Sequence, residues 1–393
     1  MADIEKLKLL SSQMTLEPSG GCPTPTPHNP GQPGKAVVHN QGPDPQTLHF
    51  SRASLPDGSR IRLLKSLLSS YCRHNCRYCP FQSGRDTARA RFEPEEFANL
   101  FISLHRADLV QGIFLSSGVY QSPGSSQDKL LDTARILRER HGFRGYLHLK
   151  IMPGAERAQV KEAMLLADRL SVNLEAPTPP TLSRLAPEKD WGDDLLRPLR
   201  WIAEIRRDHH PRMSWNHRWP SSSTQFVIGP AGETDWELLS ATDHLYQVSG
   251  VSRAYYSSFT PIPNTPLEGR PPASRTRELR LYQASFLLRD YGYDLEDLPF
   301  ETSGALPLHQ DPKTAWAEKF LKDQPQEINT ASRETLLRIP GLGPRSTQKI
   351  LASRRRDRIR TLEQLQSLGI QTVRAAPYLE INGKLPARQL SLF

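Results

Sequence analysis

Three of the four cysteines in this chain stand within eight residues, in the segment YCRHNCRYCP: Cys72, Cys76 and Cys79. A closed structural zinc site takes four ligands, usually as two separated pairs. Here no second pair follows, and the remaining thiol, Cys22, lies about fifty residues upstream in a Pro-rich segment. Three thiolates on a [4Fe–4S] cluster leave one iron without a protein ligand. The spacing therefore predicts a cluster whose open iron binds a cofactor, with a zinc knuckle as the alternative.

A repeating pattern of short β-rich runs and longer amphipathic runs surrounds this segment from about residue 60 onward. The predicted strands are 62–70, 112–117, 146–151, 169–176, 224–229 and 253–259. The predicted helices are 93–107, 127–141, 155–168, 193–209, 233–249 and 274–292. Six β/α units in a row imply parallel strands with right-handed crossovers. The fold class is therefore α/β, either a doubly wound sheet or a full or partial barrel.

Two of the predicted strands alternate between apolar and polar residues. His148 and Lys150 interrupt one of them, and Asn173 and Glu175 interrupt the next. A parallel strand that is buried on both faces reads instead as a continuous apolar run. One face of these strands must line polar space, which favours a wide barrel with a site inside it. A polar core network among the four residues is the alternative, and it does not exclude a site.

The cysteine loop follows the first predicted strand directly. In a βα barrel it lies at the carboxyl ends of the strands, where barrel active sites form. The pattern Cys-x3-Cys-x-aromatic-Cys at this place, with Tyr78 as the aromatic residue, resembles the radical S-adenosylmethionine superfamily. The resemblance implies a partial (β/α)6 TIM-like barrel, with a [4Fe–4S] cluster and S-adenosyl-L-methionine as cofactors.

The chemistry implied by the resemblance is reductive cleavage of S-adenosylmethionine, with an electron donor such as flavodoxin or ferredoxin. The product is a 5′-deoxyadenosyl radical that abstracts a hydrogen from the substrate. The positions that match cofactor contacts of the superfamily are Tyr78, Ser116, Ser117, Gly118, Asn173, Glu175 and Gly229. At residues 116–118 many members have Gly-Gly-Glu, and this chain has no glutamate there. Its contacts to the methionine amino group therefore differ from the superfamily pattern.

Tyr255 and Tyr256 are adjacent in the last predicted strand and are the candidates for returning a hydrogen to the substrate radical. Successive strand residues point to opposite faces of a sheet. Only one of the two tyrosines can face the barrel interior. The alternative is that both are ordinary packing residues.

Positive charge is concentrated at the C-terminal end of the chain. Residues 328–393 contain twelve Lys and Arg but four acidic residues, and the whole chain has a net charge of +9. Within them, 328–355 reads as helix, tight turn, helix and resembles a helix-hairpin-helix motif, which grips the DNA backbone without sequence specificity. A degenerate second copy follows at 361–381. This asymmetry is typical of a nucleic-acid-binding module.

The glycines of the hairpin turn expose backbone N–H groups at the start of the second helix, where the helix dipole helps to hold a phosphate. The predicted DNA contacts are Gly341, Gly343, Arg345, Ser346 and Lys349. Protein contact through the hairpin is the alternative, as is a merely solvated face for the arginines 354–356.

Four segments are predicted in all: an N-terminal segment 1–49 that is disordered in 18–45, a barrel 50–300, a linker 301–327 and a small all-α domain 328–393. Together they resemble radical S-adenosylmethionine proteins with a C-terminal helix-hairpin-helix, which are described as DNA modification or repair proteins. Shared stretches include LLKSLLSSYCRHNCRYC, SVNLEAPTP and NTASRETLLRIPGLGPRS. The resemblance implies an enzyme that modifies or repairs DNA, with a partner resembling uracil-DNA glycosylases.

Two other functions stay open at this point: a radical enzyme that acts on RNA, and a non-catalytic iron–sulfur scaffold that binds DNA during repair. No apolar run reaches the length of a membrane span, and the cysteines are too few for a disulfide framework. We therefore expect a soluble protein of the reducing cytoplasm.

Overall fold

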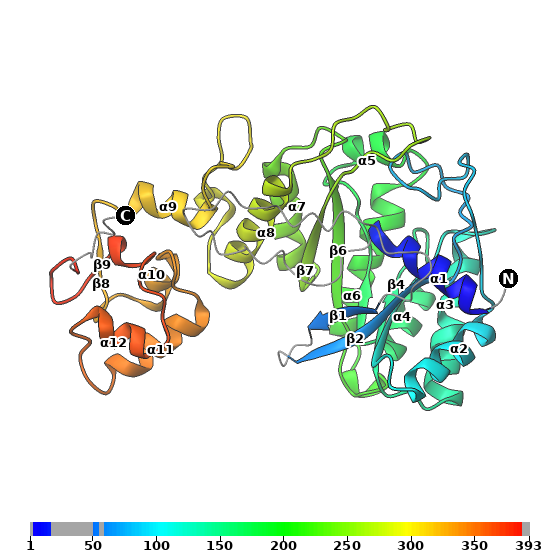
Figure 1. Ribbon diagram of the computed structural model, residues 1–393, viewed down its shortest axis with the longest axis horizontal. Helices are drawn as coiled ribbons and strands as arrows, with labels where there is room; N and C mark the ends of the chain where they lie inside the picture. The colour runs from blue at the N-terminus through cyan, green and yellow to red at the C-terminus, as the bar shows by residue number, and fades with distance from the viewer. Residues whose placement is uncertain (1–2, 17–49, 55–58, 387–393) are drawn as a thin grey trace. The chain divides into compact units, whose positions relative to one another are not determined.

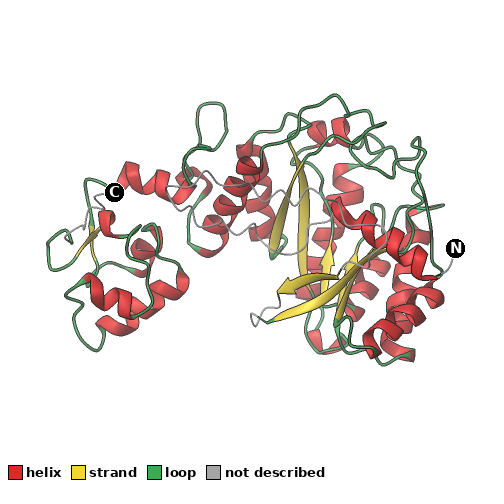
Figure 2. Ribbon diagram, viewed as in Figure 1, coloured by secondary structure: helices red, strands yellow, loops and turns green. Residues whose placement is uncertain are grey.

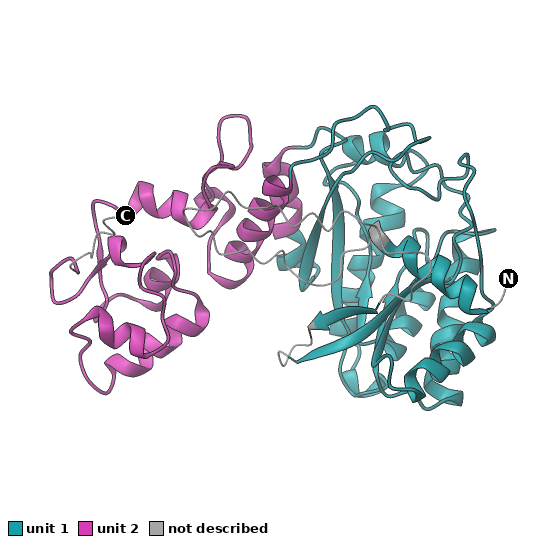
Figure 3. Cartoon of the chain, viewed as in Figure 1, with its two compact units in different colours: residues 1–233, 244–274 teal, residues 234–243, 275–393 magenta. Residues whose placement is uncertain are grey.

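The computed structural model describes residues 3–16, 50–54 and 59–386, and the chain divides into two compact units (Figure 3). The first unit comprises residues 1–233 and 244–274, and the second comprises residues 234–243 and 275–393. Cys22 and the predicted disordered segment 18–45 lie outside the described residues.

A seven-stranded sheet, whose strands follow one another in chain order, forms the first unit (Figure 1). Its strands are β1 (Phe50–Ser54), β2 (Arg60–Leu67), β3 (Gly112–Ser116), β4 (Tyr146–Lys150), β5 (Arg169–Ser171), β6 (Ser221–Ile228) and β7 (Arg253–Ser258). β1 is antiparallel to β2, and every pairing from β2 to β7 is parallel. Residues from all seven strands line one cavity, so the sheet curls around it. The prediction of a partial six-stranded β/α barrel is confirmed.

Helices follow the strands and surround the sheet (Figure 2). They are α2 (Pro94–Arg106), α3 (Pro123–Arg135) with a π-helical turn η2 (Ile136–Arg140), α4 (Arg157–Leu166), α5 (Pro179–Leu185), a π-helical turn η3 (Trp191–Leu196) continuing as α6 (Arg197–Asp208), and α7 (Asp235–Val248). Helix α2 shows why these segments are helical: a capping box joins Glu93 and Glu96 at its start, and Phe97 and Phe101 repeat four residues apart on its buried face.

Helix α1 and strand β1, both near the N-terminus, lay outside the predicted pattern. Helix α1 (Asp3–Ser12) packs against β2, and its Leu7 and Leu10 are fully buried. Its Lys6 pairs with Glu96 of α2. Residues 3–12 are therefore part of the first unit, and the predicted separate N-terminal segment 1–49 is corrected to that extent.

A buried ion pair lies near the amino ends of β4 and β5. The Arg138 guanidinium Nη2 donates to Asp168 Oδ2 at 3.0 Å, and its carbon lies 3.6 Å from the Trp215 ring centroid. Asp168 also accepts a hydrogen bond from the Leu147 backbone N–H. Burial lowers the pKa of Arg138 to about 10 despite the carboxylate of Asp168, so the guanidinium stays charged at neutral pH and needs its partner.

We expect Asp168→Ala to lower the free energy of unfolding by about 3–5 kcal/mol, because it leaves a buried cation without its counter-charge. Urea denaturation followed by circular dichroism measures the loss. Glu204→Ala is the matched control, since it removes an exposed carboxylate 3.8 Å from Arg157 and is expected to change stability by at most about 1 kcal/mol. An equal loss of unfolding free energy in the two variants would show that the Arg138–Asp168 pair stabilises the fold no more than an exposed ion pair does.

Helices dominate the second unit. Besides residues 235–243 of α7, its elements are α8 (Arg275–Asp290), η5 (Leu295–Asp297), α9 (Pro312–Phe320), β8 (Gln326–Glu327), α10 (Arg333–Arg338), α11 (Pro344–Arg354), α12 (Leu362–Ser367), η6 (Ala376–Tyr378) and β9 (Leu379–Glu380). The short β8 and β9 pair in parallel, so the predicted all-α domain also holds a two-residue ladder.

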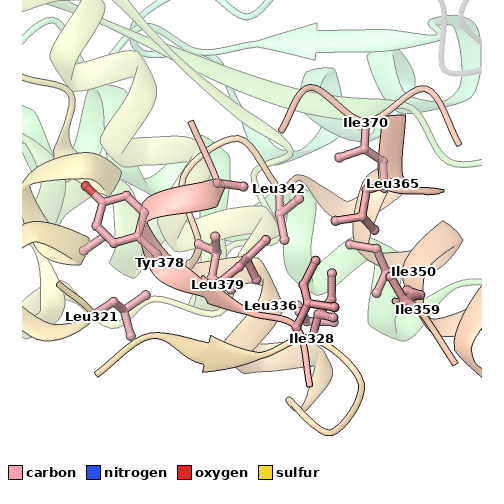
Figure 4. Packing of buried hydrophobic residues seen from close by; sticks show 14 residues of the cluster. Leu321, Ile328, Leu336, Leu342, Ile350, Ile359, Leu365, Ile370, Tyr378 and Leu379 are labelled. Carbon is pink, nitrogen blue, oxygen red and sulfur yellow. The ribbon is translucent and has the colours of Figure 1, made fainter. Parts of the chain in front are cut away.

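One hydrophobic core joins the two predicted hairpins (Figure 4). Leu336, Ile350 and Leu365 are fully buried in it. Ala317 and Leu321, from α9 and its end, belong to the same core. The predicted linker 301–327 therefore contributes a helix, α9, to this core. No helix in the described ranges is long and apolar enough to cross a membrane.

Candidate metal and cofactor site

The cysteine loop begins where β2 ends, at the carboxyl edge of the parallel sheet. Backbone hydrogen bonds hold it in place: the Ser70 N–H donates to Ala90 O, and the Arg73 N–H donates to Val119 O at 2.8 Å. Within the loop the Cys79 N–H donates to Cys76 O at 3.0 Å. Main-chain pairing with neighbouring loops thus sets the loop's path.

The three thiols interact with one another electrostatically. Burial raises the pKa of Cys79, and the neighbouring Cys76 and Cys72 raise it further. Burial likewise raises the pKa of Cys76, with Lys189 opposing and Cys72 adding to the shift. Cys72 contributes to the pKa shift of both Cys76 and Cys79, so the loop gathers all three predicted ligands in one place.

The arrangement differs from that of a site for one metal ion. Within residues 3–16, 50–54 and 59–386, no three Cys, His, Asp or Glu side chains are placed to hold a single ion. On a [4Fe–4S] cluster each thiolate binds a different iron, so the ligand sulfurs lie farther apart than those around one ion. The donor set of three neighbouring thiols therefore fits such a cluster.

A buried carboxylate stands beside the loop. Burial, and then the neighbouring Glu175, raise the pKa of Tyr78 well above its usual value. Glu175 Oε1 accepts from Lys189 Nζ at 3.2 Å, while Oε2 is buried and has no hydrogen-bond partner among the described residues. Glu175 also has φ +64°, a strained conformation for a non-glycine residue. Cys76, Tyr78 and Glu175, which are predicted site residues from two distant segments, thus lie together.

Lys189 was not a predicted site residue. Its side chain is only 8% exposed, and its charge opposes the upward shift of the Cys76 pKa. Burial alone would lower its pKa, but Cys76 and Glu175 together raise it, so the amine stays protonated. It follows α5 in a loop whose path the sequence does not reveal, and nothing in the pattern PEKD marks it as buried.

The loop after β3 packs on the cysteine loop. The Gly118 N–H donates to Ser69 O at 2.7 Å, and a Cβ on Gly118 would lie 2.3 Å from Tyr71 O. Only glycine fits this close approach. Ser116 is buried, and Ser117 Oγ donates to Gly118 O at 2.8 Å. The predicted residues 116–118 therefore lie against the cysteine loop.

Asn173 and Gly229 have separate surroundings. Asn173 is buried and lines the cavity inside the barrel. The Gly229 N–H donates to Glu233 Oε1, and a Cβ on Gly229 would lie 2.8 Å from Ala273 Cβ. With φ +111°, Gly229 is required by the local backbone. Its role at adenine stays a prediction.

The two tyrosines of β7 point in opposite directions. Tyr255 lines the barrel cavity, and its hydroxyl oxygen accepts from Arg169 Nη1 at 3.3 Å. Tyr256 is fully buried and its ring lies 6.1 Å from that of Phe226. Of the two candidates, Tyr255 is thus the one that faces the interior.

In the second unit, the turn between α10 and α11 holds Gly341 at φ +83°, with Gly343 as the N-cap of α11. Arg345 is exposed and Ser346 half-buried on the first turn of α11. Lys349 Nζ donates to Leu368 O at 2.6 Å, so it ties α11 to the end of α12. Arg354 Nη1 donates to the carbonyls of Ile328 and Ala331, at 2.9 and 2.7 Å.

These contacts divide the predicted basic surface into two groups. Lys349, which is exposed, and Arg354, which is half-buried, both donate hydrogen bonds within the unit, and the exposed Arg345, Arg355 and Arg356 form the second group. Sequence spacing alone did not separate the two groups.

No family model matches the chain, and no curated protein matches it. Among solved structures, the [FeFe]-hydrogenase maturase HydG from Carboxydothermus hydrogenoformans matches with 14% identity over 58% of this chain and 51% of that chain, at a TM-score of 0.44. Methylornithine synthase PylB matches with 15% identity over 58% and 62% of the two chains, also at 0.44. HemN from Escherichia coli, whose structure is described as that of a radical SAM enzyme, matches with 13% identity over 57% and 51%, at 0.35.

The matched region thus spans between half and two thirds of these three proteins. At such identities and TM-scores the likeness carries no conclusion about the function of this chain.

Proposed function

We propose that this chain is a radical S-adenosylmethionine enzyme that acts on DNA. The observation that carries the proposal is the gathering of Cys72, Cys76 and Cys79 on one loop at the carboxyl edge of a six-stranded partial barrel. When bound there, a [4Fe–4S] cluster and S-adenosylmethionine supply a 5′-deoxyadenosyl radical that abstracts hydrogen. The three thiols hold the cluster in this proposal.

Neighbouring residues provide a buried polar surface for the cofactor. Glu175 Oε2 is a buried acceptor without a partner in the described part of the chain, which suits a donor on S-adenosylmethionine such as its amino group or a ribose hydroxyl. Lys189 holds the other carboxylate oxygen and fixes the orientation of the group. Tyr78 is buried on the same side, close enough to Glu175 for the carboxylate to raise its pKa.

A loop after β7 helps to exclude water. Gln82 Nε2 donates to Asn264 O at 3.4 Å, and Arg85 Nε donates to Pro263 O at 3.1 Å. These bonds hold residues 263–264 against the segment that follows Cys79. A reactive radical needs such shielding, because water and stray donors would quench it.

Support for a DNA substrate comes from the second unit. Its two hairpins share one core, and Arg345, Arg355 and Arg356 are exposed on them. Exposed arginines of the basic segment 328–393 suit phosphates, which they bind with little dependence on sequence. In this proposal the second unit captures DNA and raises the local concentration of substrate for the barrel.

Deuterium transfer tests the proposal most directly. Reconstituted, reduced protein is mixed with S-adenosylmethionine and a pool of DNA deuterated in base and sugar, and 5′-deoxyadenosine is analysed by mass spectrometry. We expect deuterium in the 5′-deoxyadenosine. If deuterium came from deuterated RNA of the same sequence and not from DNA, the substrate would be RNA. No cleavage of S-adenosylmethionine under any of these conditions would favour a non-catalytic scaffold.

Tyr255 is the candidate for returning a hydrogen to the substrate. We expect Tyr255→Phe to block product formation while cleavage of S-adenosylmethionine continues, because the phenol O–H is lost and the ring stays. Tyr256→Phe is the matched control, since Tyr256 packs on Phe226 in the core and is expected to keep the product yield. Product and 5′-deoxyadenosine are quantified in the same reaction. Equal product yields from the two variants would remove the role of Tyr255.

A further inference from the structure

One row of side chains crosses the inner face of the barrel from β2 to β5. The strand register places Lys65 beside Phe114, Phe114 beside His148, and His148 beside Arg169. All four side chains line the same cavity. Four neighbouring strands thus contribute two cations and two aromatic rings at one level of the barrel.

The contacts along this row confirm that the side chains meet. The rings of Phe114 and His148 are stacked, with centroids 4.0 Å apart and planes 11° apart. Lys65 Nζ lies 5.9 Å from the Phe114 centroid. Arg169 Nε donates to Ser221 Oγ at 3.0 Å, and its Nη1 donates to the Tyr255 hydroxyl. Those two partners of Arg169 are neutral hydroxyls, so neither cancels its charge.

The residues that line the cavity give it a positive charge. Its empty space measures about 500 Å³, including the part that is open to solvent. Arg52 from β1 adds a third cation to those of Lys65 and Arg169. No Asp or Glu is among the described residues that line it.

Two polar atoms in the cavity wall lack partners. His148 Nε2 and Ser171 Oγ are buried, and neither makes a hydrogen bond in the described part of the chain. A buried polar group without a partner is costly, so an occupant that bonds to both atoms is favoured. Burial, followed by Arg169, Lys150 and Lys65, lowers the pKa of His148 well below its usual value. The ring is therefore neutral at neutral pH, and Nε2 is available as a donor or an acceptor.

We propose that this cavity binds a phosphate monoester, the terminal phosphate of a nucleotide or of a nucleic-acid end, through Lys65, Arg169 and Ser171. The proposal deepens the proposed function, on which it rests for the choice of a nucleotide rather than another phosphorylated molecule. An arginine fork with a lysine and a hydroxyl surrounds the three oxygens of a phosphate better than the two oxygens of a carboxylate.

A terminal phosphate fits better than an internal one. A phosphodiester inside a strand continues in both directions, so the strand would have to enter and leave the same cavity. A monoester ends the chain and carries nearly two negative charges at neutral pH, since its second pKa is about 6. β2 runs from Lys65 to the cysteine loop. A nucleotide anchored on the row therefore extends along the strands toward the three thiols.

Isothermal titration calorimetry on the full chain, without cluster or cofactor, tests the assignment. The probes are deoxyadenosine 5′-monophosphate, deoxyadenosine, inorganic phosphate and a dinucleotide with only an internal phosphodiester. We expect the monophosphate to bind at least tenfold more tightly than each of the other three. Arg169→Gln and Lys65→Met are expected to weaken it at least tenfold, because each removes one charge-assisted contact.

Two further variants guard against misfolding. Ser171→Ala removes only a hydroxyl and is expected to weaken the monophosphate about three- to tenfold. Arg140→Gln changes an exposed arginine of the same unit, which pairs with Glu95, and is expected to bind like the wild type. Thermal melts confirm that each variant is folded.

Equal binding of monophosphate and nucleoside would overturn the proposal, as would wild-type binding by Arg169→Gln, Lys65→Met and Ser171→Ala. Inorganic phosphate bound as tightly as the nucleotide would overturn the assignment to a nucleotide. The calorimetry needs no S-adenosylmethionine, so failure of the proposed radical chemistry and failure of this site give different results.

Discussion

Anaerobically reconstituted protein is expected to hold about one [4Fe–4S] cluster per chain, and Cys72→Ala, Cys76→Ala and Cys79→Ala are each expected to hold none. With only three thiolates available, the loss of one leaves two irons without a protein ligand. Iron and sulfide analysis, together with electron paramagnetic resonance of the reduced protein, measures the cluster. S-adenosylmethionine cleavage should disappear with it.

Cys22→Ala is the matched control for these variants. It removes the one cysteine outside the 71–80 segment, and it should keep the full cluster content. A stoichiometric zinc ion in the protein as purified without added metal would contradict the prediction. So would a protein without any cysteine that still bound iron at full stoichiometry.

The second large effect concerns DNA binding by the second unit. The logarithm of the affinity should fall linearly with the logarithm of the salt concentration, by about 0.9 per phosphate neutralised. We expect the triple variant Arg345→Gln, Arg355→Gln, Arg356→Gln to lower this slope by about two to three units, since each exposed arginine is taken to neutralise one phosphate. Fluorescence anisotropy with duplexes of unrelated sequence, at several salt concentrations, measures the slope.

Lys322→Gln is the matched charge control, because Lys322 is exposed in the same unit but lies outside the hairpins. It should leave the slope unchanged. Gly341→Val is expected to weaken binding through the turn itself: a Cβ there would lie 3.2 Å from Arg374 Cβ, and φ is +83°. An unchanged slope in the triple variant would show that these three arginines do not contact DNA.

For Lys349, thermal stability has to be measured together with the salt dependence of DNA binding. Its amine donates to Leu368 O, so Lys349→Ala removes a tie between the two hairpins as well as a charge. A lower slope in that variant is informative only with a melting curve beside it.

The order of the barrel strands was predictable because β/α alternation is a local pattern. Each apolar run from β2 to β7 is followed by an amphipathic segment, and the observed strands begin and end within a few residues of the predicted ones, except that β5 stops at Ser171. β1 was not predictable in the same way. Its residues, FSRAS, gain their strand conformation from pairing with β2.

The site residues that were predictable are those set by local sequence, and the others depend on contacts between distant segments. The cysteines share one loop, and their spacing alone predicts a cluster. The inward direction of His148 follows from alternation within its strand. Its place in a row with Lys65 and Arg169 depends on the register between strands, which no single segment encodes. The burial of Lys189 depends on the fold of a loop far from the cysteines.

The close contact between Gly118 and Tyr71 has a consequence for how the proposed enzyme would respond to oxygen. The Gly118 N–H donates to Ser69 O and its Cα lies against Tyr71 O, so the loop after β3 fixes the start of the cysteine loop through main-chain contacts. If the proposed cluster were destroyed by oxidation, these contacts would still be present. Repair would then need fresh iron and sulfide and reduced thiols.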